Sequence, residues 1–160
     1  MINDPKLIIQ EFCRSARSIG LVCGNIEHEV QQAPHEPHPL PKGKCAVYVF
    51  SLSEAYGKYC PAGSGRVLKV GKAGPNSNAR FQSQHYKPGR APSTFAATLV
   101  TSRILWPYLG ITQVTSEEVE DWIKYNTDRD NFYFDSSDAP LLSELEKYIK
   151  GRLGPAFEGG

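Results

Sequence analysis

Two short segments rich in β-branched and aromatic residues lie in the middle of the chain, and they constrain the fold most strongly. Residues 45–52 (CAVYVFSL) and 66–71 (RVLKVG) have the composition of β-strands. Residues 53–65 between them are rich in Gly, Pro and Ser, as is typical of a loop. Two strands joined in this way most economically form an antiparallel hairpin, and the unusual length of its loop indicates a role in binding.

Helical patterns surround these strands. Residues 4–19 carry apolar side chains at helical spacing, with Asp4 as the expected N-cap and Pro5 at the first helical position. Further helices are expected over residues 79–86, from a capping signature at Thr115 to residue 125, and over residues 141–153. Residues 131–134 (NFYF) predict a third strand. The apolar residues 93–110 have no period that decides between helix and strand.

This order of elements predicts an α+β domain, a small three-stranded antiparallel sheet flanked by helices, with an N-terminal helical extension. Residues 31–42 are rich in Pro and His and have the chemistry of a linker. Their prolines exclude a helix that would make His35 and His38 a metal-binding pair. We therefore expect an N-terminal helix and linker over residues 1–42, and the main domain over residues 43–160.

Composition narrows the class of protein further. A chain of 160 residues suits a single domain, and no apolar stretch approaches the roughly 20 residues that cross a membrane. The N-terminus lacks the pattern of a secretory signal, so we expect a cytoplasmic protein without a membrane partner. The four cysteines form no CxxC pair, and we expect them to be free, buried thiols.

Charge is distributed unevenly along the chain, although the net charge is only +1. Residues 42–90 hold nine basic side chains and one acid, a net charge of +8. Residues 115–146 hold ten acids and two basic side chains, a net charge of −8. The basic segment is suited to binding phosphate, whereas two oppositely charged faces without any partner are the plain alternative.

Four features in sequence order resemble the GIY-YIG nuclease family: AVY at residues 46–48, KVG at residues 69–71, Arg80, and Glu146. In that family the two tripeptides lie on neighbouring strands of a three-stranded antiparallel sheet. The arginine lies on the next helix, and the glutamate lies on a helix after the third strand. The resemblance covers residues 45–158 and implies a GIY-YIG-like nuclease domain within residues 43–160, with no counterpart for the N-terminal third.

The two tripeptides supply two candidates for activating the attacking water. Tyr48 lies on a predicted strand, so its hydroxyl can project from one face of the sheet, where it would orient or deprotonate the water. Its alternative role is that of a core tyrosine. Lys69 stands where the family name has its second tyrosine, as in some branches of the family. It would act as a proton acceptor or a phosphate clamp, and its alternative is a solvated strand lysine.

Arg80 is the expected phosphate ligand, because a guanidinium can donate two parallel hydrogen bonds to phosphate oxygens. Its alternative is an ordinary surface arginine. His85 follows five residues later, where the family often has an auxiliary base, but this spacing does not place it on the same helix face as Arg80. A role at the helix end is the alternative for His85. Gly71 fits the family glycine, which permits a close approach of backbone.

Glu146 is the expected metal ligand, since Mg²⁺ or Mn²⁺ keeps most of its waters and one carboxylate suffices. Glu144 competes for this role, but Glu146 has the family's spacing to Pro155 and Phe157. Glu158 stands where many members have an asparagine. Basic side chains expected to contact the nucleic-acid backbone are Lys72, Lys44, Lys87 and Arg90.

We therefore expect a divalent-metal-dependent endonuclease that hydrolyses phosphodiester bonds, with DNA as substrate and RNA as the alternative. A second hypothesis is a catalytically silent nucleic-acid-binding domain of the same fold. A third is an unrelated α+β protein whose match to the motifs is accidental. A lone active site cuts one strand, so cleavage of both strands would need a homodimer or two successive encounters.

Overall fold

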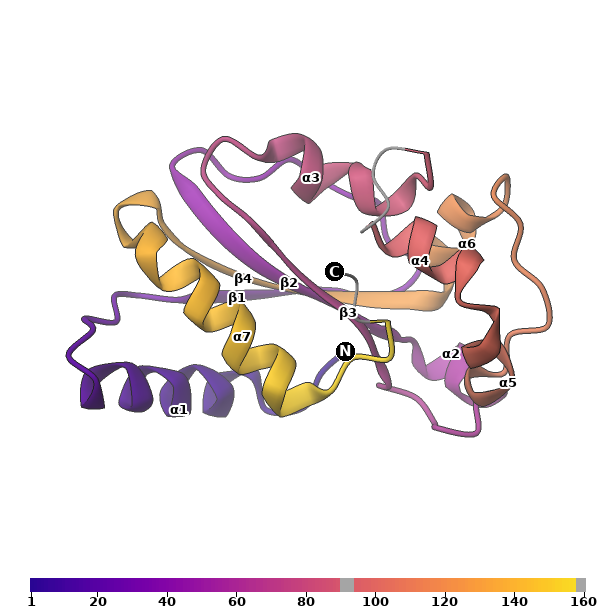
Figure 1. The fold of residues 1–160 in the computed structure, drawn as a ribbon, viewed down its shortest axis with the longest axis horizontal. Coiled ribbons are helices and arrows are strands. Elements are labelled where there is room, and N and C mark those ends of the chain that lie inside the picture. The colour runs from indigo at the N-terminus through magenta and orange to yellow at the C-terminus, as the bar shows by residue number, and fades with distance from the viewer. Residues whose placement is uncertain (90–93, 158–160) are drawn as a thin grey trace.

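The two predicted strands do form an antiparallel hairpin, and they belong to a sheet of four strands. In this computed structural model, which describes residues 1–89 and 94–157, the sheet order is β1-β4-β2-β3 and every neighbouring pair is antiparallel (Figure 1). The strands are β1 (Glu27–Gln31), β2 (Lys44–Leu52), β3 (Val67–Ala73) and β4 (Thr127–Asp135). The α+β class is thereby confirmed.

The expectation of three strands was wrong, because the N-terminal third of the chain supplies β1. This strand pairs with β4 from Glu27 opposite Tyr133 to Gln31 opposite Arg129. Its sequence, EHEVQ, is polar and lacks the β-branched and aromatic residues that signal a strand. Charged side chains are common on edge strands, where they oppose pairing with a second chain. A composition rule therefore misses such a strand.

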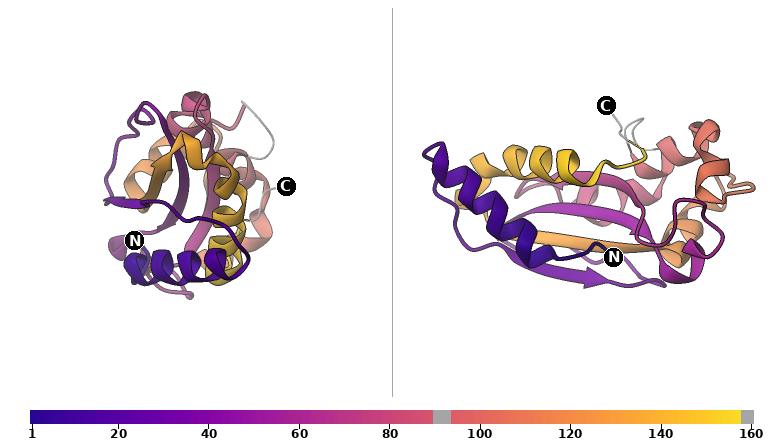
Figure 2. Two further views of the ribbon diagram at one scale, coloured as in Figure 1. Left: turned by 90° about the vertical axis from the view of Figure 1, so that its left-hand side faces the viewer. Right: turned by 90° about the horizontal axis from the view of Figure 1, so that it is seen from below.

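Both faces of the sheet are covered by helices (Figure 2). On one face α1 (Pro5–Ser18) and α7 (Leu142–Leu153) pack together over a core that includes Val47, Val49 and Phe132. On the other face lie α3 (Asn78–Gln82), α4 (Phe95–Thr101) and α6 (Val119–Asn126). Because β2 is buried on both sides, its alternate residues enter two separate cores.

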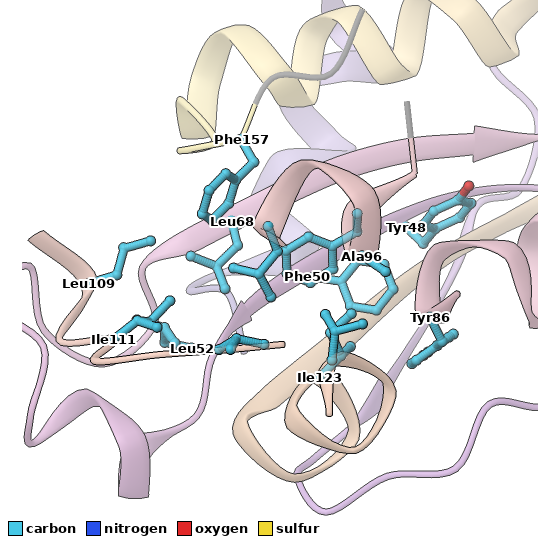
Figure 3. Close-up of a cluster of buried hydrophobic side chains, with 14 of the residues drawn as sticks. Tyr48, Phe50, Leu52, Leu68, Tyr86, Ala96, Leu109, Ile111, Ile123 and Phe157 are labelled. Carbon is cyan, nitrogen blue, oxygen red and sulfur yellow. The ribbon is translucent and has the colours of Figure 1, made fainter. Parts of the chain in front are cut away.

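The core beneath α4 and α6 runs the length of the sheet. Figure 3 shows it from Phe157 and Leu109 at one end to Tyr48 and Tyr86 at the other. Two short helices close the far end of the sheet: α2 (Glu54–Gly57), within the long hairpin loop, and α5 (Trp106–Leu109). The apolar segment 93–110, whose period did not decide between helix and strand, forms α4, a 3-10 helix (Arg103–Leu105) and α5 in its described part.

Helix boundaries differ from the expected ones at their N-termini. The helix after Asp4 is present with Pro5 in its first turn, but the Asp4 carboxylate accepts no capping hydrogen bond. Helix α6 begins at Val119, so the capping signature at Thr115 lies in a turn before it. A 3-10 helix over Ser136–Leu141 precedes α7, which begins one residue later than expected.

The prediction of four free thiols was wrong for two of them. Cys13, within α1, and Cys23, beyond its C-terminus, form a disulfide, with their Cα atoms 5.4 Å apart. Cys45 and Cys60 are free and buried, as expected. The disulfide closes the turn that leads from α1 towards β1.

Residues 32–43 contain neither helix nor strand, as their prolines predicted, but His35 within them is buried. Its Nδ1 lies 2.9 Å from the carbonyl oxygen of Thr127 and its Nε2 lies 2.8 Å from the hydroxyl of Tyr86. Burial lowers the pKa of His35 to about 4, so the ring is neutral at pH 7. This part of the linker is thus anchored to β4. Among the described residues, no helix is long and apolar enough to cross a membrane.

Candidate active site

Gly71 allows the ring of Tyr48 to lie directly against β3. The two residues are register partners on β3 and β2. A Cβ atom at position 71 would stand 2.6 Å from Cε2, 2.8 Å from Cζ and 2.9 Å from the hydroxyl of Tyr48. Such distances lie well inside van der Waals contact, so only glycine fits beneath this ring. The expected role of Gly71 in a close approach is therefore seen as a contact with a side chain.

The hydroxyl of Tyr48 pairs with His85, which a 3-10 helix (Gln84–Tyr86) after α3 carries inward. The Tyr48 oxygen lies 2.6 Å from His85 Nε2. His85 Nδ1 accepts a hydrogen bond from the backbone N–H of Phe95 at 3.0 Å. The pKa of His85 is lowered well below its ordinary value, chiefly by burial and next by the nearby positive charge of Arg80, so the ring is neutral. Its one proton is then on Nε2, which donates to Tyr48.

This hydrogen-bond direction decides what His85 can do. A ring that donates from Nε2 and accepts at Nδ1 has no lone pair facing Tyr48, so it cannot accept the phenolic proton. The spacing of five residues from Arg80, which argued against His85 in a regular helix, is resolved by the change from α3 to a 3-10 helix at Ser83. His85 therefore belongs to the site as a hydrogen-bond donor.

Tyr48 itself is fully buried. Burial raises its pKa to about 12, and the positive charges of Arg129 and Arg80 oppose this shift. The hydroxyl is consequently a neutral phenol at pH 7. It lies 3.4 Å from the carbonyl oxygen of Lys72, its second neighbour after His85.

A cavity of about 370 Å³ lies beside this tyrosine, at the edge strand β3 between α3 and α7. Figure 1 shows these two helices on opposite sides of the strands. Basic side chains reach the cavity from three elements, and the described residues that line it with charged groups are Lys69, Lys72, Arg80, Glu146 and Lys150. Lys69 is buried, which excludes its alternative as a solvated strand lysine. Four basic groups around one carboxylate make this cavity suited to an anion.

The structure separates Glu146 from its competitor Glu144. Glu146 lines the cavity, and only 17% of its side chain is exposed. Glu144 is 44% exposed, pairs with Lys147 at 3.6 Å and lies on the side of α7 next to α1, outside this cavity. Residues two positions apart on a helix point in different directions, so only one of the two can face the cavity.

A divalent cation in this cavity would find one carboxylate as its protein ligand and would have to keep most of its waters. Glu146 offers a carboxylate at the wall, and the volume leaves room for several waters at about 30 Å³ each. No group of three or more His, Cys, Asp or Glu side chains that could hold a metal occurs among residues 1–89 and 94–157. A metal at this site would therefore rest on a single carboxylate, which Mg²⁺ tolerates.

Lys44 and Lys87, which were also expected to contact nucleic acid, do not line this cavity. Lys44 is held at the start of β2 by Asp135 at 2.9 Å and Glu27 at 3.7 Å, and the first of these raises its pKa. Lys87 is exposed after the 3-10 helix that carries His85. Arg90 and Glu158 lie outside the described residues.

Arg129 on β4 is a residue of this site that the sequence patterns missed. Its guanidinium is fully buried and lies 4.7 Å from the ring centre of Tyr48 and 4.3 Å from that of Phe81. It donates to the Phe81 carbonyl at 2.7 Å, the Tyr86 hydroxyl at 3.1 Å and Asn131 Oδ1 at 2.9 Å. In the sequence, Arg129 and Asn131 alternate with the acids of β4, and this spacing of two could have predicted that they share one face of the strand.

Lys150 is the second residue that was missed. It follows Glu146 by four residues, which places both on one face of α7, and this spacing was a signal available from the sequence.

No protein-family model matches this chain, and neither curated proteins nor solved structures give a significant match.

Proposed function

We propose that this protein is a divalent-metal-dependent endonuclease of the GIY-YIG type, which hydrolyses phosphodiester bonds in nucleic acid, with DNA as the expected substrate. The observation that carries the proposal is the cavity at β3. This one cavity, beside Tyr48, is lined by four residues that were chosen from the sequence alone: Lys69, Lys72, Arg80 and Glu146. An accidental match of short motifs gives no reason for these side chains to converge.

The side chains around the cavity can be assigned to the needs of phosphodiester cleavage. Arg80 binds non-bridging phosphate oxygens through its planar guanidinium. Lys69 lines the cavity, whereas Tyr48 lies behind Gly71, so Lys69 is favoured for contact with the attacking water or the phosphate. Tyr48 and His85 form the buried hydrogen-bonded pair that supports this wall. When bound at Glu146, Mg²⁺ or Mn²⁺ supplies positive charge for the phosphate oxygens.

A catalytically silent nucleic-acid-binding domain is the competing proposal. Its support is the burial of Tyr48, together with the two lysine ammonium groups near the Glu146 carboxylate, at 3.9 Å for Lys72 and 3.7 Å for Lys150. Such a domain would bind nucleic acid in a salt-dependent manner and be indifferent to a chelator.

Cleavage of supercoiled plasmid DNA separates the two. We expect nicking or linearisation with Mg²⁺ or Mn²⁺, none with excess EDTA, and none with Glu146→Gln. Glu144→Gln is the matched control, because Glu144 lies on the same helix outside the cavity. It should cleave as the wild type does. Single-stranded DNA and RNA substrates are tested in parallel.

Intact plasmid, single-stranded DNA and RNA with the wild-type protein in the presence of metal would favour the silent binding domain. Equal loss of cleavage in both glutamate variants would remove Glu146 from its assigned role.

Arg80→Ala should lower the turnover number more than the affinity for nucleic acid, because the contact of Arg80 with the phosphate strengthens as charge develops there.

A further inference from the structure

Two ammonium groups converge on the carboxylate of Glu146. Lys150 Nζ lies 3.7 Å from Glu146 Oε1, and Lys72 Nζ lies 3.9 Å from the same oxygen. Lys72 crosses from β3 to α7, where its Nζ also donates to Ser143 Oγ at 2.8 Å. The negative charge of Glu146 is therefore neutralised from the neighbouring strand and from its own helix.

These two cations conflict with a divalent cation at the same oxygen. Like charges within a few ångströms repel strongly, and more so where the carboxylate is shielded from water, as Glu146 is at 17% exposure. The lysine side chains are 30% and 41% exposed, so both have room to leave. Each also lines the cavity that holds Arg80. A lysine that leaves Glu146 therefore remains within the space that a phosphate group would enter.

We propose that Lys150 exchanges between two partners: it neutralises Glu146 in the metal-free protein, and it binds a phosphate oxygen of the nucleic acid once Glu146 has taken a divalent cation. This inference rests on the proposed function, because it needs a metal at Glu146 and a nucleic acid in the cavity. Its consequence is that metal and nucleic acid strengthen each other's binding, since each favours the same released state of Lys150.

The plain alternative is that Lys150 forms an ordinary helix-surface ion pair with Glu146. Such pairs at a spacing of four residues contribute little and are easily replaced. Lys147 represents that case on the same helix, with 77% exposure and Glu144 at 3.6 Å. Lys150→Met and Lys147→Met therefore form a matched pair of variants. Methionine preserves an unbranched side chain and a good helix propensity, so both variants should fold.

The first measurement is Mn²⁺ binding by titration calorimetry, without nucleic acid. Lys150→Met should bind Mn²⁺ about fivefold to tenfold more tightly than the wild type, because one competing charge is gone. Lys147→Met should stay within about twofold of the wild type.

The second measurement is the affinity for a fluorescent DNA duplex, followed by anisotropy in EDTA and in saturating Mn²⁺. In the wild type we expect Mn²⁺ to strengthen binding about tenfold, within the usual range of coupling between sites. In Lys150→Met the gain in affinity caused by Mn²⁺ should fall to about threefold or less, and we attribute the gain that remains to Lys72. In EDTA, Glu146→Gln should bind the duplex more tightly than the wild type, and the double variant Glu146→Gln/Lys150→Met should lose most of that gain.

The outcomes separate this inference from the proposed function. If Mn²⁺ binds the wild type and not Glu146→Gln, while Lys150→Met matches the wild type in both measurements, the exchange is refuted and the metal ligand stands. If the wild type binds no Mn²⁺, both the metal role of Glu146 and the exchange are refuted. A Lys147→Met variant that behaves as Lys150→Met does would show a general charge effect, and it would also overturn the exchange.

Discussion

Replacing Gly71 with alanine should destabilise the protein by forcing the Tyr48 ring away from β3. The added Cβ would lie 2.6 Å from the nearest ring atom, whereas ordinary contacts begin at 3.4 Å. The ring would have to move by about 0.8 Å. It has little room to do so, since Phe81 and His85 stand against it with ring centres at 5.8 Å and 5.1 Å, and the Arg129 guanidinium lies 4.7 Å away.

Overpacking of this kind in a close-packed core costs about 1–3 kcal/mol. For a chain of this size the cost corresponds to a melting temperature lower by roughly 2–12 °C. The matched control is Gly151→Ala in α7, where a Cβ meets nothing within 4 Å. The same substitution there should stabilise the protein by about 0.5–1 kcal/mol, because alanine has the higher helix propensity.

Urea unfolding of the two variants, followed by circular dichroism, measures both effects. Opposite signs are expected for Gly71→Ala and Gly151→Ala. A Gly71→Ala protein as stable as the wild type would refute the close packing of Tyr48 on Gly71. A loss of stability in both variants would point instead to a general intolerance of alanine for glycine.

Two further predictions concern buried polar groups. Arg129→Met should lower the free energy of unfolding by about 2–4 kcal/mol, because it leaves buried acceptors such as the Phe81 carbonyl without a donor. Lys87→Met, at an exposed position, should change it by less than about 0.5 kcal/mol. Equal losses in urea unfolding would contradict this. Folding lowers the pKa of His35 from 6.5 to about 4, so the neutral ring makes its full contribution to stability above pH 6.5. About 3 kcal/mol of the free energy of unfolding should be lost as the pH falls from 6.5 towards 4. His35→Gln should flatten that pH dependence, and an unchanged slope would remove His35 as its source.

Local sequence patterns predicted the parts of the fold that depend on neighbouring residues. The strands around residues 45–52 and 66–71 form the expected hairpin, because β-branched and aromatic side chains suit a pleated, buried surface. The helix after Asp4 forms because its apolar residues share one face. Strand β1 could not be predicted in this way, because its polar residues become a strand only through pairing with β4.

The candidate site shows the same division. Tyr48, Arg80 and Glu146 were identified from the order of short motifs, because the residue types needed for binding phosphate and metal are few. Glu146 was preferred to Glu144 by its spacing to Pro155 and Phe157, whereas the position of Glu146 at a cavity beside β3 depends on which side of α7 faces the sheet. That orientation results from contacts between segments far apart in the chain.

The sequence alone determined the α+β class, the central hairpin and the chemical types of the site residues, since each depends on composition and short-range spacing. Only the tertiary structure decided the fourth strand, the proton position on His85, the burial of Arg129 and the contact of Lys150 with Glu146. The reason is physical: whether a polar group is buried, and which partner it then finds, is set by elements that pack against it from elsewhere in the chain.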